Sequence, residues 1–199
     1  MPLVDLILAS GSPRRRELLS LTGLTFEVIA PDTDEHTGLG ARDAVQELAK
    51  RKALAVAALY PGQIVLAADT LVAIDEVPLG KPSNEEDACR MLRRLSGRWH
   101  QVYTGVCVVN QDGQLFSGLD ASDVRFASMS EEDIQSYVAT GEPMDKAGAY
   151  ALQGIAAMFV EEVHGTPSGV IGLPLSLTCR LLRQCGLSIR PEKATQNKR

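Results

Sequence analysis

The sequence of 199 residues lacks several patterns that define common classes of protein. Its four cysteines form no C-x-x-C pair, and its three histidines do not cluster near them, which argues against a zinc site and a disulfide framework. No apolar run approaches the ~20 residues of a membrane-spanning helix. The apolar run that ends at Ala9 is too short for the core of a signal peptide. We therefore expect a cytoplasmic protein with free thiols and no membrane partner.

Basic residues are in deficit, because the formal net charge is −5. General binders of nucleic acid or of a membrane surface usually carry a basic excess, so this balance argues against nucleic acid as a partner. The chain also contains neither a Walker G-x-x-x-x-G-K-[ST] motif nor a Rossmann glycine pattern. A nucleotide site in this protein would have to be built in another way.

Short apolar runs alternate with helical patterns, and 45% of the residues are hydrophobic, as in a globular domain with an ample core. We expect strands at 6–9, 26–30, 64–68, 70–74, 77–79, 99–110, 114–127 and 159–163. We expect helices that follow Ser12, Ser83 and Ser130 as N-caps, and further helices at 41–59 and 173–185. The alternation predicts an α/β fold with a central mixed, partly antiparallel sheet flanked by helices. Residues 1–189 are predicted to form a single domain in two lobes, and residues 190–199 a polar C-terminal tail.

The stretch LILASGSPRRRELL at residues 6–19 predicts an anion site. A buried-type strand leads into a helix with Pro13 at its first position, and a helix N-terminus offers free N–H groups and partial positive charge. Three arginines, Arg14 to Arg16, follow at the end where cations oppose the helix dipole. Such a local cost often marks function, and guanidinium groups suit phosphate. The alternative is a solvated run of surface charge, which stays open above all for Arg16.

Acidic residues follow two other predicted strands. Asp69 comes after the apolar run 64–68, and a buried carboxylate needs a partner, for which a metal ion is suitable. Asp34 or Glu35, in the loop 31–40, could join Asp69 on a hard divalent cation. The alternatives are a helix cap or buried salt bridge for Asp69 and solvated turn residues for the loop.

Two lysines complete the candidate site. Lys52 lies on the apolar stripe of the helix at 41–59, where it either snorkels outward or has a partner. Lys81 lies between Gly80 and Pro82, which restricts its backbone. Both lysines could reach one cleft and neutralise a polyphosphate.

Eight motifs, in order from residue 8 to residue 174, resemble those of the Maf family of nucleoside triphosphate pyrophosphatases. They are LASGSPRR at 8–15, DE at 34–35, LAKRKA at 48–53, AADT at 67–70, GKP at 80–82, LSG at 95–97, DKAGAYALQG at 145–154 and GLP at 172–174. The resemblance implies a two-lobed fold with a deep cleft, similar to that of inosine triphosphate pyrophosphatases. It implies hydrolysis of a nucleoside triphosphate between the α and β phosphates, with Mg²⁺ or Mn²⁺ as cofactor, and a homodimer.

The same resemblance implies roles for individual residues. Asp69 would be the general base that activates the attacking water, and Glu35 would bind the metal together with Asp69. Phosphate binding would fall to Ser10, Arg14, Arg15, Lys52 and Lys81.

Three positions divide the family by substrate. In this chain they are Arg14, Thr70 and Gln153, as in the branch that acts on dTTP and UTP. The branch that acts on 7-methyl-GTP has tryptophan, glutamine and glutamate instead. A glutamine carboxamide can both donate to and accept from a uracil or thymine edge, which suits the first branch.

Two alternatives to this function stay open. The chain could be a regulatory interaction protein in cell division that binds nucleotide or nucleic acid without turnover, or a 7-methyl-GTP pyrophosphatase. One departure from the family pattern is Gly169, where many members have asparagine. Its missing side chain removes a hydrogen bond near the cleft and puts the rigidity of that loop in question.

Overall fold

A computed structural model describes residues 4–189 of the chain. The predicted polar tail, residues 190–199, lies outside the described residues. Within residues 4–189, none of the helices has the length and apolar character needed to cross a membrane. The cytoplasmic location and the homodimer stay predictions.

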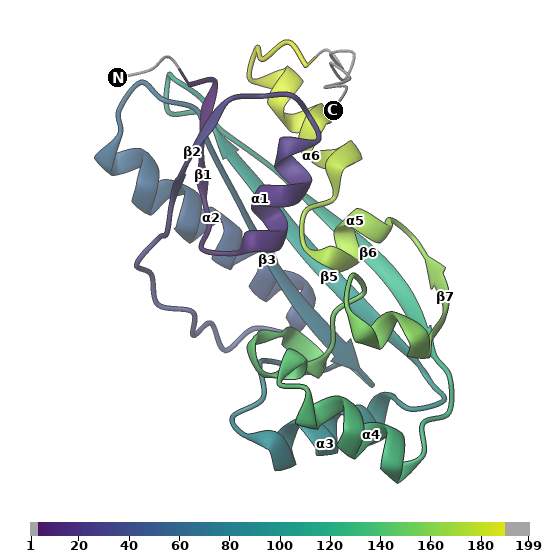
Figure 1. The fold of residues 1–199 in the computed structure, drawn as a ribbon. Helices are drawn as coiled ribbons and strands as arrows, with labels where there is room; N and C mark the ends of the chain where they lie inside the picture. Colours follow the sequence, from purple (N-terminus) through teal and green to yellow (C-terminus); the bar gives the residue numbers. More distant parts are fainter. Residues whose placement is uncertain (1–3, 190–199) are drawn as a thin grey trace, which may run out of the picture.

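A single seven-stranded sheet runs through the molecule (Figure 1). Its strands are β1 (Leu6–Ala9), β2 (Phe26–Ile29), β3 (Val65–Ile74), β4 (Val77–Leu79), β5 (Trp99–Val109), β6 (Leu115–Phe126) and β7 (Val160–His164). The order is β2-β1-β3-β5-β6-β7, and β4 pairs with β3 outside this path. The pairs β2–β1 and β1–β3 are parallel, whereas β3–β5, β5–β6 and β6–β7 are antiparallel. The predicted mixed α/β sheet is therefore confirmed.

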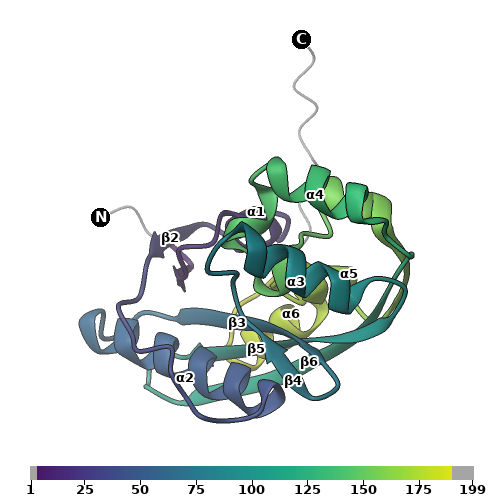
Figure 2. The same ribbon diagram turned by 90° about the horizontal axis from the view of Figure 1, so that it is seen from below.

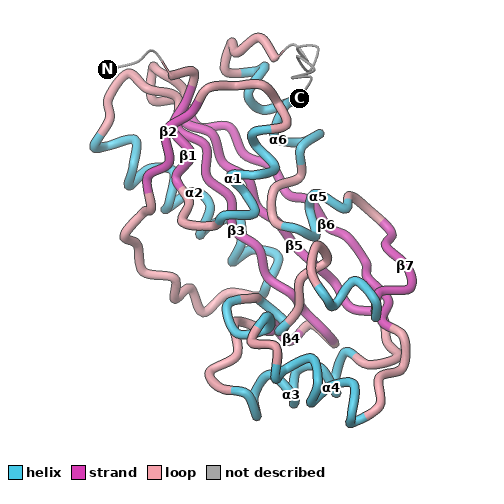
Figure 3. Tube along the Cα trace, viewed as in Figure 1, coloured by secondary structure: helices cyan, strands magenta, loops and turns pink. Residues whose placement is uncertain are grey.

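Helices cover both faces of this sheet. The helices are α1 (Pro13–Ser20), α2 (Ala41–Leu59), α3 (Glu85–Leu95), α4 (Glu131–Ala139), α5 (Pro167–Ile171) and α6 (Leu175–Gln184), with 3₁₀ turns η1 (Glu142–Asp145), η2 (Ala147–Ala149) and η3 (Ile155–Phe159). Helix α2 packs on one face, whereas α3 and α4 lie on the other (Figure 2). The loops and 3₁₀ turns between α4 and α5 gather around one region of the sheet (Figure 3). Buried apolar side chains fill both interfaces.

Strand β3 positions the candidate site. Its pairing with β1 ends at Leu66, and its pairing with β4 begins at Val72, so residues 67–71 have no strand beside them on that edge. On the other edge, β3 is continuously paired with β5. Because side chains alternate along a strand, neighbouring residues in this bare stretch face opposite sides of the sheet. A pocket at this gap can therefore collect side chains from both faces.

The predicted break at Asp69 is wrong. We expected strands at 64–68 and 70–74 with Asp69 beyond the first, but β3 runs unbroken from Val65 to Ile74, with Asp69 inside it. The register explains this, because Asp69 pairs with Gly105 of β5 and is held in the ladder like its neighbours. Asp69 does lie beyond the end of β1, which is the strand that stops.

Three other details of the helices differ from the expectation. Helix α3 is capped by Asn84, whose side chain accepts from the backbone N–H of Asp87, and not by Ser83. Ser12 precedes α1 as predicted, but its side chain forms no capping bond. A short helix, α5, precedes the last helix. Gly172, at φ 127°, ends α5 and separates it from α6. The capping box at Ser130 is confirmed.

Candidate active site

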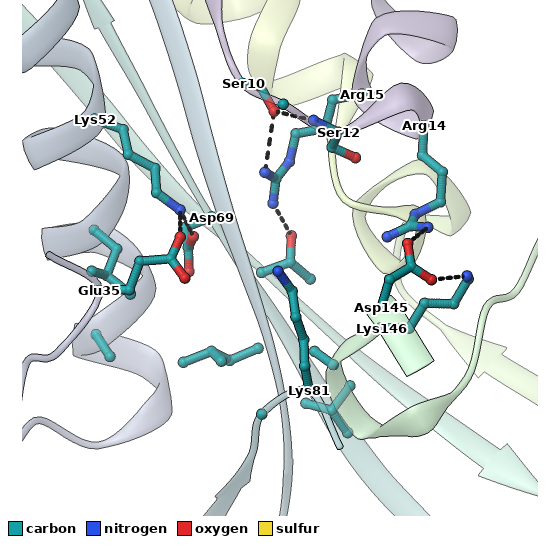
Figure 4. A pocket seen from close by; sticks show the side chains of 18 of the residues that line it. Ser10, Ser12, Arg14, Arg15, Glu35, Lys52, Asp69, Lys81, Asp145 and Lys146 are labelled. Carbon is teal, nitrogen blue, oxygen red and sulfur yellow. Dashed lines mark hydrogen bonds and ion pairs between the residues drawn. The ribbon is translucent and has the colours of Figure 1, made fainter. Parts of the chain in front are cut away.

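A cavity of about 740 Å³ lies at the bare edge of β3. It is lined by the nine residues to which the family resemblance gave roles: Ser10, Arg14, Arg15, Glu35, Lys52, Asp69, Thr70, Lys81 and Gln153. Asp34, the other acid considered for the metal, lies outside the lining, and its carboxylate accepts from the backbone N–H of His36 at 2.9 Å. The nine lining residues come from α1, α2, β3 and four loops (Figure 4). The structure thus brings the set together, and the roles given to its members stay predictions.

The first wall of the pocket is a lysine between two carboxylates. The Nζ atom of Lys52 lies 2.6 Å from Oδ1 of Asp69 and 2.6 Å from Oε1 of Glu35. Lys52 and Asp69 are each only 7% exposed, whereas Glu35 stands on the exposed loop before α2. The hydrogen bond from Lys52 lowers the pKa of Glu35 below its ordinary value. Lys52 therefore does not snorkel outward, and its burial is explained by two anionic partners.

Close packing of α2 on the sheet brings Lys52 to this position. Gly105 on β5 lies directly under the helix, and a Cβ there would be 2.3 Å from the carbonyl oxygen of Val45. Only glycine permits that approach. Because Asp69 pairs with Gly105 across the sheet, the carboxylate points to the same side as α2.

The second wall centres on Arg15, on the opposite face of the sheet. Its Nε donates to the carbonyl of Gly172 at 2.9 Å, its Nη2 to Oγ1 of Thr70 at 3.1 Å and its Nη1 to Oγ of Ser10 at 3.4 Å. All three acceptors are neutral. Burial lowers the pKa of Arg15, while the carboxylate of Asp69 raises it. A guanidinium remains protonated under such conditions, and two of its five N–H groups are left without an acceptor among the described residues.

The turn after β1 prepares the same wall for an anion. Ser10 is 3% exposed, and its hydroxyl accepts from the backbone N–H of Ser12 at 3.2 Å. That contact fixes the turn just before α1, and the first turn of this helix lines the pocket. Ser10 therefore joins the helix N-terminus to the guanidinium of Arg15.

A third wall contains two partly buried cations around one exposed acid. Arg14 lies 3.5 Å from Asp145, and Lys146 lies 2.5 Å from the same carboxylate (Figure 4). Sequence reasoning placed Arg14 here but assigned no role to Asp145 or Lys146, although both begin the motif DKAGAYALQG. A lysine beside an aspartate reads as a neutral surface pair, and only the fold shows that both line the cavity. Arg16, by contrast, is exposed and lies outside the lining, so the alternative kept for it holds.

Lys81 and Gln153 complete the rim. Both are exposed, and the side chain of Lys81 extends into the pocket from the loop after β4 (Figure 4). Gln153 stands in the turn before η3, which Glu142 fixes by accepting from the backbone N–H of Ile155 at 2.9 Å. The rim is therefore polar and is mounted on short turns, whereas the two buried walls stand on helices and a strand.

The donor set for a metal consists of Glu35 and Asp69. No group of three or more histidine, cysteine, aspartate or glutamate side chains with metal-site geometry occurs within residues 4–189. The two carboxylates do converge, because one ammonium contacts both. Mg²⁺ is commonly held by one or two carboxylates together with water and substrate phosphates, so these residues fit a divalent cation that arrives with a polyphosphate.

These features define a class of protein before any comparison. An open α/β fold carries a cleft with a buried carboxylate, a second acid, a helix N-terminus and several cations, and such a site suits a phosphoanhydride. The profile of the family described as Maf-like protein matches residues 5–185. The chain belongs to the Maf family.

Relatives and a solved structure agree with this assignment. A dTTP/UTP pyrophosphatase of Symbiobacterium thermophilum is 51% identical over 187 residues, which cover 93% of this chain and 96% of that protein. Proteins of the same name from Anaeromyxobacter dehalogenans and from a Geobacillus strain are 51% and 50% identical, and cover 92% of this chain in each case and 95% and 98% of those proteins. The solved Ham1 protein of Staphylococcus aureus superposes with a TM-score of 0.51 at 15% identity, over 90% of this chain and 96% of that chain. That likeness shows the fold alone.

Proposed function

We propose that this protein hydrolyses dTTP and UTP between the α and β phosphates, which releases a nucleoside monophosphate and pyrophosphate. The observation that carries the proposal is the meeting of Asp69 and Arg15 in one cavity at the bare edge of β3. A buried carboxylate and a guanidinium without an anionic contact suit water activation and phosphate binding, respectively. The relatives named dTTP/UTP pyrophosphatase support the choice of substrate.

The second wall would bind the triphosphate. The two unengaged N–H groups of Arg15, the N-terminus of α1 and the ammonium of Lys81 offer donors around one region of the cavity. Donors that are already in place cost little reorganisation when charge develops on the leaving pyrophosphate. Arg14 and Lys146 would add charge at the outer end.

The first wall would activate water. A water oxygen attacks the α-phosphorus, the bond from that phosphorus to the α–β bridging oxygen breaks, and the proton passes to Asp69. Lys52 donates to Oδ1, so Oδ2 is the oxygen that would take the proton. A divalent cation, when bound by Glu35 and Asp69, would supply charge neutralisation of the phosphates. A phosphate oxygen of the substrate would be a suitable further partner for the ammonium of Lys52.

Selection of the base would fall to the rim. The carboxamide of Gln153 can both donate and accept, as the edge of uracil or thymine requires. Arg14 lines the same cavity. Replacing Arg14, Thr70 and Gln153 with tryptophan, glutamine and glutamate, respectively, should shift preference away from pyrimidines, and unchanged selectivity would place specificity elsewhere.

The experiment is an assay of pyrophosphate release from dTTP, UTP, CTP, GTP and 7-methyl-GTP, with Mg²⁺ or Mn²⁺. Asp69→Asn is the control, for which we expect a loss of about 10²–10⁴-fold with the fold intact by circular dichroism. Release from dTTP and UTP that depends on metal and on Asp69 would support the proposal. Release from 7-methyl-GTP alone would support the proposed reaction but contradict the proposed substrates. No release from any nucleotide would contradict the proposed reaction.

A further inference from the structure

A row of polar side chains crosses the sheet beneath the second wall. Thr70 of β3 is directly opposite Thr104 of β5, which is directly opposite Asp120 of β6. Thr104 is fully buried and lies behind the pocket lining. Its hydroxyl is 2.9 Å from the hydroxyl of Thr70 and 2.9 Å from the carbonyl oxygen of Gly169 in α5. A buried hydroxyl placed between the pocket and the core needs an explanation that the proposed reaction does not give.

The direction of each hydrogen bond in this row follows from counting protons. A hydroxyl has one proton, and a carbonyl oxygen can only accept. Thr104 must therefore donate to Gly169, which leaves Thr104 able only to accept from Thr70. Thr70 then has no proton to offer on the pocket side, and this agrees with the guanidinium of Arg15 donating to it. This series of hydrogen bonds runs in one direction, from Arg15 through Thr70 and Thr104 to the Gly169 carbonyl.

The far end of this series of hydrogen bonds, at Gly169, is held by its packing against Asp120. A Cβ on Gly169 would lie 2.1 Å from a carboxylate oxygen of Asp120, so α5 packs directly on that acid. Asp120 accepts from the hydroxyl of Thr166 at 2.8 Å and from that of Ser122 at 3.1 Å. The carboxylate of Asp120 therefore occupies the space that an asparagine at position 169 would need. The contacts of Asp120 and of the Gly169 carbonyl fix this loop, and they substitute for the hydrogen bond that the missing side chain would make.

We propose that Thr104 is a positioning residue, which fixes the hydroxyl of Thr70 as a hydrogen-bond acceptor and thereby holds the guanidinium of Arg15 ready for a phosphate. This inference rests on the proposed function, since it assigns phosphate binding to Arg15. It changes the part that Thr70 plays. Thr70 orients Arg15 and has no proton to donate to a base.

The test compares Thr104→Val, which keeps the shape and removes the hydroxyl, with Thr104→Ser, which keeps the hydroxyl. The matched control is Thr178→Val, because Thr178 is also fully buried and its hydroxyl has no partner among the described residues. Three quantities are measured: the affinity for pyrophosphate by calorimetry, the KM and kcat for dTTP, and the exchange of the Arg15 Nε–H with solvent by NMR.

We expect Thr104→Val to weaken pyrophosphate binding and raise the KM about three- to tenfold, as the loss of one hydrogen bond predicts. The Nε–H of Arg15 should exchange faster in that variant, because the side chain is less firmly held against the Gly172 carbonyl. Thr104→Ser and Thr178→Val should remain within about twofold of the native protein. A residue with only a structural role would lower the melting temperature without moving the KM or the NMR signal.

Each outcome decides between the inference and the proposed function. Native affinity, KM and Nε–H exchange in folded Thr104→Val would overturn the positioning role while leaving the pyrophosphatase activity in place. A native protein that neither binds pyrophosphate nor releases it from dTTP would overturn both. If Thr104→Val does not fold, Thr104→Ala against Thr104→Ser provides the same contrast, with the same expected and contrary results.

Discussion

Lys52 and Arg15 enter the same pocket from opposite faces of the sheet and are held in opposite ways. Lys52 contacts two carboxylates at 2.6 Å each. Arg15 is held by two hydroxyls and a carbonyl, none of them charged. The first cation is neutralised where it lies, and the second keeps its charge available. The difference separates a wall built to keep two acids together from a wall built to receive an anion.

The choice of residue type on each wall follows from acid–base chemistry. An ammonium loses its proton readily when it is buried without an anion, whereas a guanidinium stays charged. Neutral partners therefore suffice for Arg15, although burial lowers its pKa. Lys52, at 7% exposure, is placed where carboxylates support its charge.

The largest effect on stability is expected from Lys52→Gln. Removing this ammonium leaves Asp69 buried opposite Glu35 with no cation in contact with it, so the free energy of unfolding should fall by roughly 3 kcal/mol. Mg²⁺ or Mn²⁺ should restore part of the loss by binding the freed carboxylates. Chemical denaturation with and without the metal measures both. Lys50→Gln, on the exposed side of the same helix, is the control and should change little.

The next effect concerns affinity, and Arg15→Gln should produce it. The loss of charged hydrogen bonds to phosphate should weaken pyrophosphate binding about 10- to 150-fold. Stability should fall by less than about 1 kcal/mol, since no buried charge is left unpaired. Arg16→Gln provides the matched exposed control. If Arg15→Gln and Lys52→Gln cost the same stability, the contrast between the two walls is wrong.

His100 extends the comparison to a group that does give up its charge. It is fully buried, its Nε2 is 2.8 Å from the hydroxyl of Tyr150, and burial lowers its pKa from 6.5 to about 4. The unfolded chain binds this proton below pH 6.5 and the folded chain does not until about pH 4. Stability should therefore be complete above pH 6.5 and fall as pH decreases, by roughly 2 kcal/mol at pH 5.

His100→Gln tests this reading of the core. The amide can still bond to Tyr150 but does not titrate, so the decrease between pH 7 and pH 5 should become shallower in urea denaturation. His164→Gln, at an exposed histidine, should keep the full decrease. The same pH dependence in all three proteins would show that His100 is not its source.

The smallest effect is expected on the third wall. Asp145, whose side chain is exposed, contacts the partly buried Arg14 at 3.5 Å and Lys146 at 2.5 Å, and ion pairs that solvent reaches contribute about 0–1 kcal/mol. Asp145→Asn should strengthen pyrophosphate binding about two- to fivefold at low salt, and 0.5 M salt should erase the gain. Asp112→Asn, in an exposed turn, is the control. A gain that persists at high salt would contradict the surface character of this wall.

Much of the fold could be predicted from local pattern. The four apolar residues of β1, the stripe of α2 and the capping box at Ser130 each carry a signal within a few neighbouring residues, and each was found where expected. The shift from Ser83 to Asn84 shows the limit of such signals, because both residues can cap a helix and the choice depends on where α3 packs.

The site was predictable as a set of residues but not as an arrangement. Motifs identified nine of the residues that line the cavity, and none of these motifs revealed that Asp69 lies within a strand or that Lys52 contacts both acids. Thr104 had no signal at all, since a threonine in a β-strand is ordinary. Its contacts depend on the register of β3 against β5, which arises between residues far apart in the sequence.

The pocket at the bare edge of β3 exists only because the two strands on that edge, β1 and β4, are short. If β1 extended beyond Ala9, or β4 beyond Leu79, the added backbone would pair with residues 67–71 and close the gap with every side chain still present. Pro13 and Pro82 follow these two ends, and proline cannot donate to a sheet. Insertions and deletions beside these prolines should therefore be tolerated less than substitutions, whereas the loop 31–40 can vary in length as long as Glu35 still reaches Lys52.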